Sequence, residues 1–484
     1  MSKKTSLEYN AIQSKGQRKA PATRTMSEDA MLKPRDRRKL TGTVHDQMRN
    51  LSLVAWMVRK HLDYVTDFNV LIRTGNDALD AKLNQLFEWH GRKENFDICK
   101  RHSRRRALRL WESHRATDGD ALAVMLKTGN LQFIEGDRIA GATATFPKKN
   151  RPKTLNDNGL VLDQYGAVKK YAITNRVDRD LVYSHMVDAK YCIFDGYFQR
   201  FDQTRGISPL TTAITTFQDL YENWDFTLLK IKLHALFGIA ISQKLDEEDT
   251  GINDDGEQEG DIGSDEFGTA ASAGTANAGE AEINFMDGPQ LLRLEPGEGA
   301  DTIESKTPNS GFLDFSEVMI RAGLLALDIP YTFYDSMKSS FSARIIDRND
   351  YEESCRQKRE SIRSFLNQYT AWKVAAWARL PDVAKLMKAA GITDARELVR
   401  AVEWIPAGQP WYDPKSQIEA ELKAVAGGIQ SRQRICQKYN LGDWRKIVRE
   451  LEEEEREIEK RKVSVAIGDP GQETKGQEEG DGNE

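Results

Sequence analysis

The sequence predicts an α+β protein that is mainly helical. Two long stretches, residues 209–243 and 342–377, carry apolar residues at the spacing of a helical face. Between residues 117 and 173 the spacing changes to alternation, which indicates short strands joined by tight turns. Because these strands follow helical segments in the chain, we expect helices and strands to share an α+β domain.

The composition is that of a chain with much polar surface. Its 484 residues suffice for two or three domains, and 30% of them are charged while 39% are hydrophobic. The longest clean apolar run, residues 235–241, is too short to cross a bilayer, so no membrane segment is expected. The cysteines lie far apart without a CxxC pair, which indicates free thiols in a reducing compartment. They are Cys99, Cys192, Cys355 and Cys436.

The first part of the chain is strongly basic. Residues 1–50 hold twelve Lys and Arg against five Asp and Glu, a net charge of +7, although the whole chain has a net charge of −5. Apolar periodicity is absent before Val44, so residues 1–43 are predicted to be a disordered basic arm. The arm is either a solvated tail or a contact with nucleic acid or an acidic neighbour, and both interpretations stay open.

Three helices are predicted next, at residues 44–64, 77–90 and 96–115. The third is the most basic in the chain, which is typical of DNA-binding helices. Leu108 and Trp111 give it a buried side, however, and its arginines could instead pair with acids of a neighbouring subunit. These arginines are Arg104, Arg105, Arg106 and Arg109.

Residues 117–173 contain two predicted strand pairs. The first turns at Lys-Thr-Gly-Asn, residues 127–130, and the second turns near Tyr165 and Gly166. Farther along, His185 stands in VYSHMV with no Cys or His at metal-ligand spacing around it, so we expect a structural histidine. No catalytic residue, cofactor site or metal site is predicted anywhere in the chain.

The long helix from residue 209 opens with a good cap, because Ser208 suits the N-cap and Pro209 the first turn. Its apolar residues recur in alternating steps of four and three. Such a long stripe needs helical neighbours, either in the same chain or in other copies of it. The stripe consists of Leu210, Ile214, Phe217, Tyr221, Trp224, Leu228, Ile231 and Ala235.

The chain then turns acidic. Residues 246–287 hold fourteen Asp and Glu and no Lys or Arg. A calcium loop was considered, but the carboxylates lack the regular ligand spacing and the closing Glu. We therefore expect an acidic flexible insert, followed by short strands within residues 283–303.

A helix at 311–328 is predicted to stop before Pro330, which lacks an N–H and disfavours the α region in the preceding residue. A polar loop and the helix from residue 342 follow, without a nucleophile–base pair. Further helices are predicted at 381–391 and 394–403. After them come an extended Pro-rich segment, a helix capped by Asp413 with Pro414 at its first position, a charged helix at 450–462, and a disordered tail at 463–484.

Five stretches, in this order, resemble the lambda-type family of tailed-phage portal proteins. Each is weak alone, but together they cover most of residues 45–450 in register. They are TDGDALAVMLKTGNLQFIEGDRI (117–139), NGLVLDQYGAVKKYAI (158–173), HMVDAKYCIFDGYFQRFDQTRGISPL (185–210), FLDFSEVMIRAGLLALDIPY with SFSAR (312–344), and WIPAGQPWYDPKSQIEAEL (404–422).

The resemblance implies a portal fold assembled as a ring of about twelve subunits. The acidic insert departs from the family pattern, because it lies where the narrow clip end is expected. The implied parts are an α+β wing (44–208), a stem helix (209–243), a clip with the insert (244–310), a second stem helix (311–330), a tunnel loop (331–341), a long wing helix (342–380) and a helical crown (381–462).

The resemblance also implies the function. Portal rings form the DNA channel at one capsid vertex, through which the genome is packaged and released. The implied partners are other copies of the chain, double-stranded DNA bound non-specifically, the terminase large subunit as packaging motor, a head-tail adaptor, and the major capsid or scaffolding protein. The expected location is the virion, and the host cytoplasm during assembly. The chain has no GxxxxGK[ST] loop, so we expect no enzyme and no cofactor.

In such a channel DNA must slide, so its contacts are expected to be few and directed at phosphates. Lys338 suits that role on the predicted tunnel loop, flanked by Ser336, Ser339 and Ser340. Arg344 and Arg348 begin the next helix and either face the channel or pair with acids; we favour pairing. Arg104, Arg105 and Arg106 are possible secondary contacts.

Two alternatives remain. Acidic clusters can hold magnesium, which would suit a metal-dependent nuclease, but these acids lie in a low-complexity loop rather than on a rigid scaffold. A basic helix at 92–115 would suit a DNA-binding regulator, which would be a monomer or dimer with a sequence preference.

Overall fold

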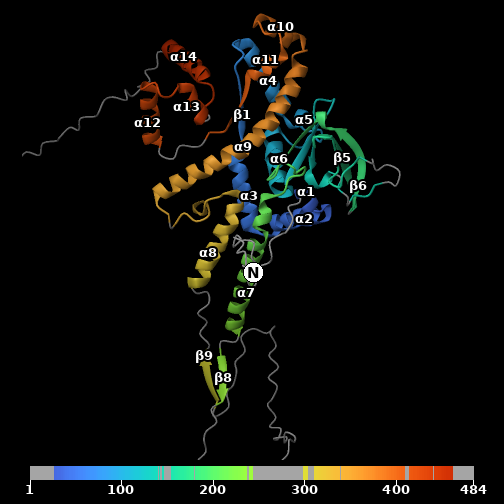
Figure 1. The fold of residues 1–484 in the computed structure, drawn as a ribbon. Coiled ribbons are helices and arrows are strands. Elements are labelled where there is room, and N and C mark those ends of the chain that lie inside the picture. Colours follow the sequence, from blue (N-terminus) through green and yellow to red (C-terminus); the bar gives the residue numbers. More distant parts are fainter. Residues whose placement is uncertain are drawn as a thin grey trace, which may run out of the picture. The chain divides into compact units, whose positions relative to one another are not determined.

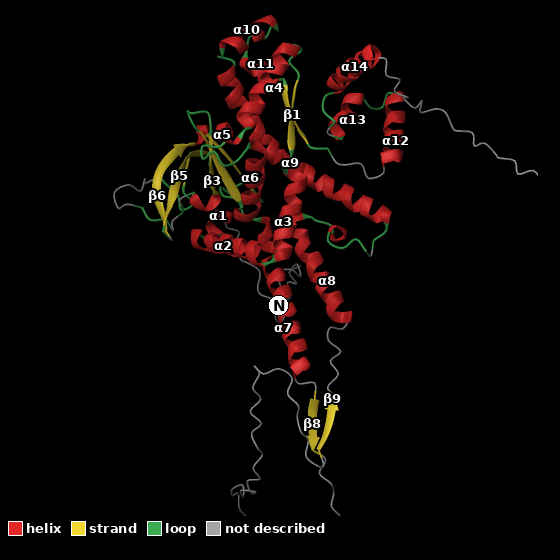
Figure 2. Ribbon diagram, turned by 180° about the vertical axis from the view of Figure 1, so that it is seen from behind, coloured by secondary structure: helices red, strands yellow, loops and turns green. Residues whose placement is uncertain are grey.

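The computed structural model describes residues 27–139, 141, 144–146, 154–178, 180–236, 239–243, 298–302, 310–337, 339–408, 414–439 and 441–461. The chain divides into two compact units, the first made of residues 1–215 and 321–484 and the second of residues 216–320. Helices dominate and the strands form only small sheets, so the predicted α+β, mainly helical class is confirmed (Figure 2).

The first unit begins with helices of which only residues 44–64 were predicted to be helical. They are α1 (Glu28–Met31), α2 (Pro34–Asn50) and α3 (Ser52–Val65). The prediction of a disordered arm up to residue 43 is therefore wrong for α2, and residues 44–64 belong to two helices instead of one. Distant contacts hold both ends of α2: the Arg37 guanidinium donates to the Gly206 carbonyl, and the Gln47 amide donates to the Ile214 carbonyl at 2.8 Å. Residues 1–26 of the predicted arm lie outside the described residues.

The predicted helix at 77–90 is confirmed as α4 (Asp77–Gly91), whose cap is Asn76: its side chain accepts the Leu79 N–H at 3.1 Å. The predicted basic helix is shorter than expected. It is broken between α5 (Lys93–Phe96) and α6 (Arg104–Asp118). The Asp97 carboxylate accepts the backbone N–H groups of Cys99 and Arg101 at 3.1 and 3.2 Å, which holds this stretch in a turn.

Two three-stranded antiparallel sheets follow, with strand orders β3-β2-β7 and β4-β5-β6. The predicted strand pairs are confirmed, with turns at Gly129 (φ +88°) and Gly166 (φ +86°), a region of φ that favours glycine. Strands β6 and β7 were not predicted. The bounds are β2 (Asp120–Met125), β3 (Leu131–Glu135), β4 (Leu160–Leu162), β5 (Val168–Val177), β6 (Asp180–Asp188) and β7 (Cys192–Gly196).

The longest helix is α9 (Phe341–Trp377), which Figure 1 shows running past α3 toward α10 and α11. Its start confirms the helix predicted from residue 342. Buried on its inner face are Tyr351, Ile362, Phe365, Leu366, Tyr369 and Trp377. The aromatic ones among them contact rings of other elements of the unit, including Trp111 of α6, whose ring lies 4.8 Å from that of Phe365.

The chain after α9 returns to the predicted wing. Strand β10 (Val402–Pro406) pairs antiparallel with β1 (Phe68–Ile72), and the Trp404 indole donates to Thr370 of α9 at 2.8 Å. A crown beginning at residue 381 is therefore wrong up to residue 406, because pairing between distant strands leaves no local signal. The helices of this part are α10 (Pro381–Ala389), α11 (Ala395–Arg400), α12 (Pro414–Ala426), α13 (Arg432–Lys438) and α14 (Trp444–Arg461).

The second unit holds most of two helices, α7 (Ile214–Leu236) and α8 (Ser310–Leu324), here called the stem helices, and the antiparallel strands β8 (Ile239–Gln243) and β9 (Glu298–Thr302). The predicted helix at 209–243 is shorter than expected. It starts with a 3-10 turn at Pro209–Thr212, capped by the Ser208 hydroxyl, and its predicted last turn is strand β8.

The predicted stop of the second stem helix is confirmed. A 3-10 turn at Leu325–Leu327 ends it, and Asp328 takes a left-handed φ of +58° before Pro330. All four cysteines are free. No helix among the described residues combines the length and the apolar character needed to cross a membrane. The acidic insert, Asp413 and the tail at 463–484 lie outside the described residues.

Candidate functional site

Four loops of the first unit meet around one buried ion pair, here called the junction. The Arg205 guanidinium donates to both carboxylate oxygens of Asp120, at 2.6 and 3.0 Å, and both side chains are at most 4% exposed. The remaining donors of Arg205 reach the carbonyls of Gly136 and Asn158 at 2.6 and 3.1 Å. The ion pair is thus bidentate, and the guanidinium also donates to two backbone carbonyls. Bidentate Arg–carboxylate pairs are among the stronger hydrogen-bonded interactions in proteins.

The junction needs glycine because backbones touch there. A Cβ at Gly119 (φ +96°) would lie 2.6 Å from the Gly206 carbonyl carbon, and one at Gly206 would overlap the Gly119 carbonyl. The N–H of Gly206 also donates to Asp120 at 2.8 Å. The junction residues come from TDGD, EGDR, NGLV and TRGISPL, parts of the stretches that carry the family resemblance. Their shared role is to fix the chain just before α7.

A second buried network ties α3, α6, β7 and α9. Glu112 accepts hydrogen bonds from His61 and the Tyr197 hydroxyl, both at 2.8 Å, and from Arg115. Asp195 lies 3.5 Å from Arg115 and accepts the Ser361 hydroxyl of α9. Burial alone would raise the pKa of Glu112, but the Arg115 charge and these hydrogen bonds lower it to about 2. The carboxylate therefore stays charged inside the unit.

The predicted tunnel loop at 331–341 is anchored by aromatic rings. Phe333, in the 3-10 turn Tyr331–Phe333, lies 5.6 Å from Tyr64 of α3 and 5.3 Å from Tyr351 of α9, measured between ring centroids. Thr332 donates to Asp347 of α9 at 2.7 Å. Toward the tip, Met337 is 93% exposed. The base of the loop is therefore fixed while its tip reaches solvent.

The serines of this loop shape the turn. Ser339 donates its hydroxyl to the Ser336 carbonyl at 3.0 Å. Ser340 caps α9, because its hydroxyl accepts the Ala343 N–H at 3.2 Å. These two hydroxyls are thus engaged within the protein, whereas Ser336 is exposed. Lys338, the predicted DNA contact, lies outside the described residues.

The arginines of α6 pair within their own chain. Arg104 stacks on Trp404 at 4.9 Å and donates to the Phe87 carbonyl at 3.1 Å, and burial lowers its pKa. Arg105 lies 3.4 Å from Asp67, and Arg109 lies 2.7 Å from Asp63. Arg106 is exposed. The acids of a neighbouring subunit, which the sequence suggested as partners, are not needed for Arg105 and Arg109.

The two arginines that follow the loop are placed on the first turns of α9. Within the described residues, the Arg344 Nε atom is enclosed without a hydrogen-bond partner. Burial raises the pKa of the Tyr64 phenol, and the positive charge of Arg348 opposes that rise. The expected pairing of Arg344 and Arg348 with acids stays a prediction.

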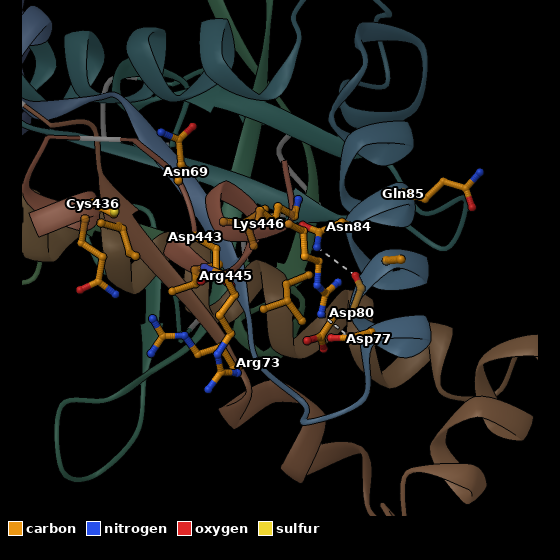
Figure 3. A pocket seen from close by; sticks show the side chains of 18 of the residues that line it. Asn69, Arg73, Asp77, Asp80, Asn84, Gln85, Cys436, Asp443, Arg445 and Lys446 are labelled. Atoms are coloured by element: carbon orange, nitrogen blue, oxygen red, sulfur yellow. Dashed lines mark hydrogen bonds and ion pairs between the residues drawn. The ribbon is translucent and has the colours of Figure 1, made fainter. Parts of the chain in front are cut away.

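A pocket of about 520 Å³ lies beside β1 and α4, with α13 and α14 on its other side (Figure 3). Its lining carries both charges, and Arg449 pairs with Asp77 at 2.6 Å, so neither sign of ligand is favoured. Burial raises the pKa of the Cys436 thiol, so this lining residue is a poor nucleophile.

The sequence analysis missed a cluster of His45, His114 and Asp118. The Asp118 carboxylate lies 2.6 Å from His45 Nε2 and 3.2 Å from His114 Nδ1. A signal for it exists, because His114 and Asp118 are four residues apart on α6 and so share one face. His185, by contrast, is an exposed residue of β6 that contacts the Ser184 hydroxyl at 3.0 Å.

Comparisons with solved structures find similar chains, among them three from gene transfer agent particles. One belongs to the virion of a native gene transfer agent particle (14% identity, 84% of this chain and 94% of that chain covered, TM-score 0.43). One belongs to the neck of the native particle computed with C12 symmetry (14%, 84% and 94%, 0.45), and one to the neck of the empty particle computed with C6 symmetry (13%, 81% and 92%, 0.43). With identities of 13–14% and TM-scores of 0.43–0.45, these similarities carry no conclusion about the assembly of this chain.

Comparison with curated proteins gives no match. The family model of lambda-family phage portal proteins, however, matches residues 15–358, which is more than half of the 484 residues. The matched range contains the junction, both stem helices and the loop at 331–341. The chain therefore belongs to the lambda family of phage portal proteins.

Proposed function

We propose that this portal protein assembles into a closed ring of about twelve copies that forms the DNA channel at one capsid vertex. The observation that carries the proposal, besides the family, is the apolar surface of the stem helices. Six large apolar side chains on them are half or more exposed in the single chain. They are Phe226, Leu228 and Leu229 on α7 and Leu313, Phe315 and Val318 on α8.

Exposed large apolar groups on neighbouring stretches of a chain mark an interaction surface. Burying one such side chain contributes about 1.5–3 kcal/mol. A head-to-tail contact between copies closes into a ring when its rotation divides the circle. Copies of the stem helices, packed side by side around an axis, would cover these side chains.

The loop at 331–341 is proposed as the tunnel loop. Its anchored base and exposed tip suit a segment that touches DNA without moving away from the channel wall. A ring of twelve would place about twelve copies of Lys338 at one height. Each pair of charges 4 Å apart in water is worth on the order of 1 kcal/mol, so the duplex would be held loosely and would still slide.

The further parts of the proposal come from the family. The terminase large subunit would dock as the packaging motor, a head-tail adaptor would bind the clip, and the major capsid or scaffolding protein would surround the ring. The ring would form in the host cytoplasm and stay in the virion. The chain itself would catalyse nothing. Incubation with plasmid DNA and Mg²⁺ should leave the plasmid intact, and cleavage would favour the nuclease alternative.

The experiment that tests the channel is a phage carrying Lys338→Glu, scored for heads assembled and for DNA per head. Lys169→Glu is the matched control, because Lys169 is an exposed lysine of β5. We expect normal numbers of heads in both, with altered DNA packaging or retention only for Lys338→Glu. Full, stably retained genomes in that variant would remove Lys338 from the DNA-contact role.

A further inference from the structure

We propose that His45, His114 and Asp118 form a binding site for one divalent transition-metal ion of the Zn²⁺ class, which would fasten α2 to α6. The ligand atoms of these three residues all lie within 4.8 Å of one another. Each oxygen of the Asp118 carboxylate faces a different imidazole, His45 at 2.6 Å and His114 at 3.2 Å. The site adjoins the junction, since Asp118 directly precedes Gly119, but it shares no ligand residue with the Asp120–Arg205 pair, and the proposed channel function does not use it.

The donor set suits this metal class. Two imidazole nitrogens and one carboxylate are ligands that Zn²⁺ and its neighbours in the transition series prefer. Three protein ligands leave a coordination position for water, as in many zinc sites. The Asp118 side chain is 1% exposed, whereas those of His114 and His45 are 26% and 36% exposed, so an ion can enter from the histidine side.

The backbone presets part of the geometry. His114 and Asp118 stand one helical turn apart at the end of α6, an i,i+4 spacing that directs two ligands to one face. His45 comes from α2, whose position is fixed independently through Arg37 and Gln47. The ligands therefore converge from two helices that other contacts already hold.

The residues that contact the proposed ligands also fit a metal site. Metal-binding imidazoles commonly direct their second nitrogen at a carboxylate, which orients the ring and increases its basicity. Here His114 Nε2 lies 3.8 Å from Glu135, which Arg176 holds in place, and Arg176 also pairs with Asp137 at 2.7 Å. The Thr117 hydroxyl donates to Asp118 at 2.9 Å and so orients the carboxylate.

The test uses the full chain, stripped with a chelator and titrated with Zn²⁺ by calorimetry and with Co²⁺ by visible absorption. We expect one ion per chain, the absorption of Co²⁺ in a low-coordinate N/O site, proton release, and a higher unfolding temperature with Zn²⁺. His114→Gln and, separately, His45→Gln should abolish all four. His185→Gln, a change at an exposed histidine, should leave them unaltered.

Glu135→Gln serves as a second variant, because it keeps all three ligands and neutralises the carboxylate partner of His114, while Arg176 keeps its other partner, Asp137. It should weaken Zn²⁺ binding about 10- to 100-fold without changing the stoichiometry. The absence of stoichiometric binding in the unmodified chain would overturn the proposal. Binding that survives both histidine substitutions would also overturn it, since the ion would then sit elsewhere, and the cluster would be a set of hydrogen bonds only.

Discussion

Charged groups are buried at the junction of the first unit, whereas large apolar groups are exposed on the stem helices of the second. The hydrogen bonds described for Asp120 and Arg205 all lie within one chain. Phe226 and Leu313 are 68% and 60% exposed in that same chain. The junction is thus complete within one chain, whereas under the proposed function other copies would cover the apolar surface of the stem helices. Substitutions in the two regions should therefore separate folding from assembly.

The largest effect is expected at the junction. Arg205→Met leaves the Asp120 carboxylate buried and unpaired, which should destabilise the chain by about 3–5 kcal/mol. The measurement is denaturant unfolding of the full chain. The control is Arg105→Met, which removes an exposed pair with Asp67 and should cost less than about 1 kcal/mol. Equal stability of the two variants would mean that the junction does not hold the unit together.

An effect of similar size is expected from a buried residue of the first stem helix. Phe217 is 1% exposed, so Phe217→Ala should cost about 3–5 kcal/mol of folding free energy. Phe226→Ala on the same helix is the matched control, with little effect on unfolding of the single chain. If Phe226→Ala destabilises the isolated chain as much as Phe217→Ala does, the exposed surface described for the stem is incorrect.

The buried network around Glu112 predicts a dependence on pH. Because its folded pKa is lowered from 4.5 to about 2, the carboxylate stabilises the fold above pH 4.5, and this contribution is lost as pH falls from 4.5 toward 2. The loss is on the order of 3 kcal/mol. Glu112→Gln should be less stable at pH 7 and should lose less stability across that window. Unfolding curves at pH 7, 4.5 and 3 give the comparison, and parallel losses in both proteins would contradict it.

The smallest effect is expected from the acidic insert. Deleting residues 250–280 should leave ring formation and thermal stability nearly unchanged, since a change of loop length costs little free energy. Size-exclusion chromatography with light scattering would measure the ring. Loss of soluble rings on deletion would show that the insert is structural.

Local sequence patterns correctly predicted those helices and turns that local interactions determine. Helix α4, the stop of α8 before Pro330, and the strand turns at Gly129 and Gly166 follow from caps, periodicity and turn residues. Residues 34–43 of α2 and the β1–β10 pair were missed, because each depends on contacts with distant parts of the chain. No window of sequence around α2 contains the carbonyls of Gly206 and Ile214 that hold it.

Each candidate site also has a part that the sequence could predict and a part that depends on distant contacts. The stretch carrying the loop at 331–341 was recognised from its sequence, but the rings of Tyr64 and Tyr351 that anchor it come from other helices. The glycines and charged residues of the junction were all within recognised stretches, yet their common contact appears only in the fold. Two of the three residues of the histidine cluster, His114 and Asp118, could have been recognised from their i,i+4 spacing, whereas His45 could not.

The most direct test of the account is the native mass of the full chain, measured beside a variant that replaces Phe226 and Leu313 by Ser. The account predicts a particle of about twelve subunits for the unmodified chain. The variant should stay folded, with unchanged junction stability, and should appear as monomers or small oligomers. A monomer or dimer for the unmodified chain at all concentrations, or complete rings of the variant, would contradict the claim that copies of the chain cover the stem helices.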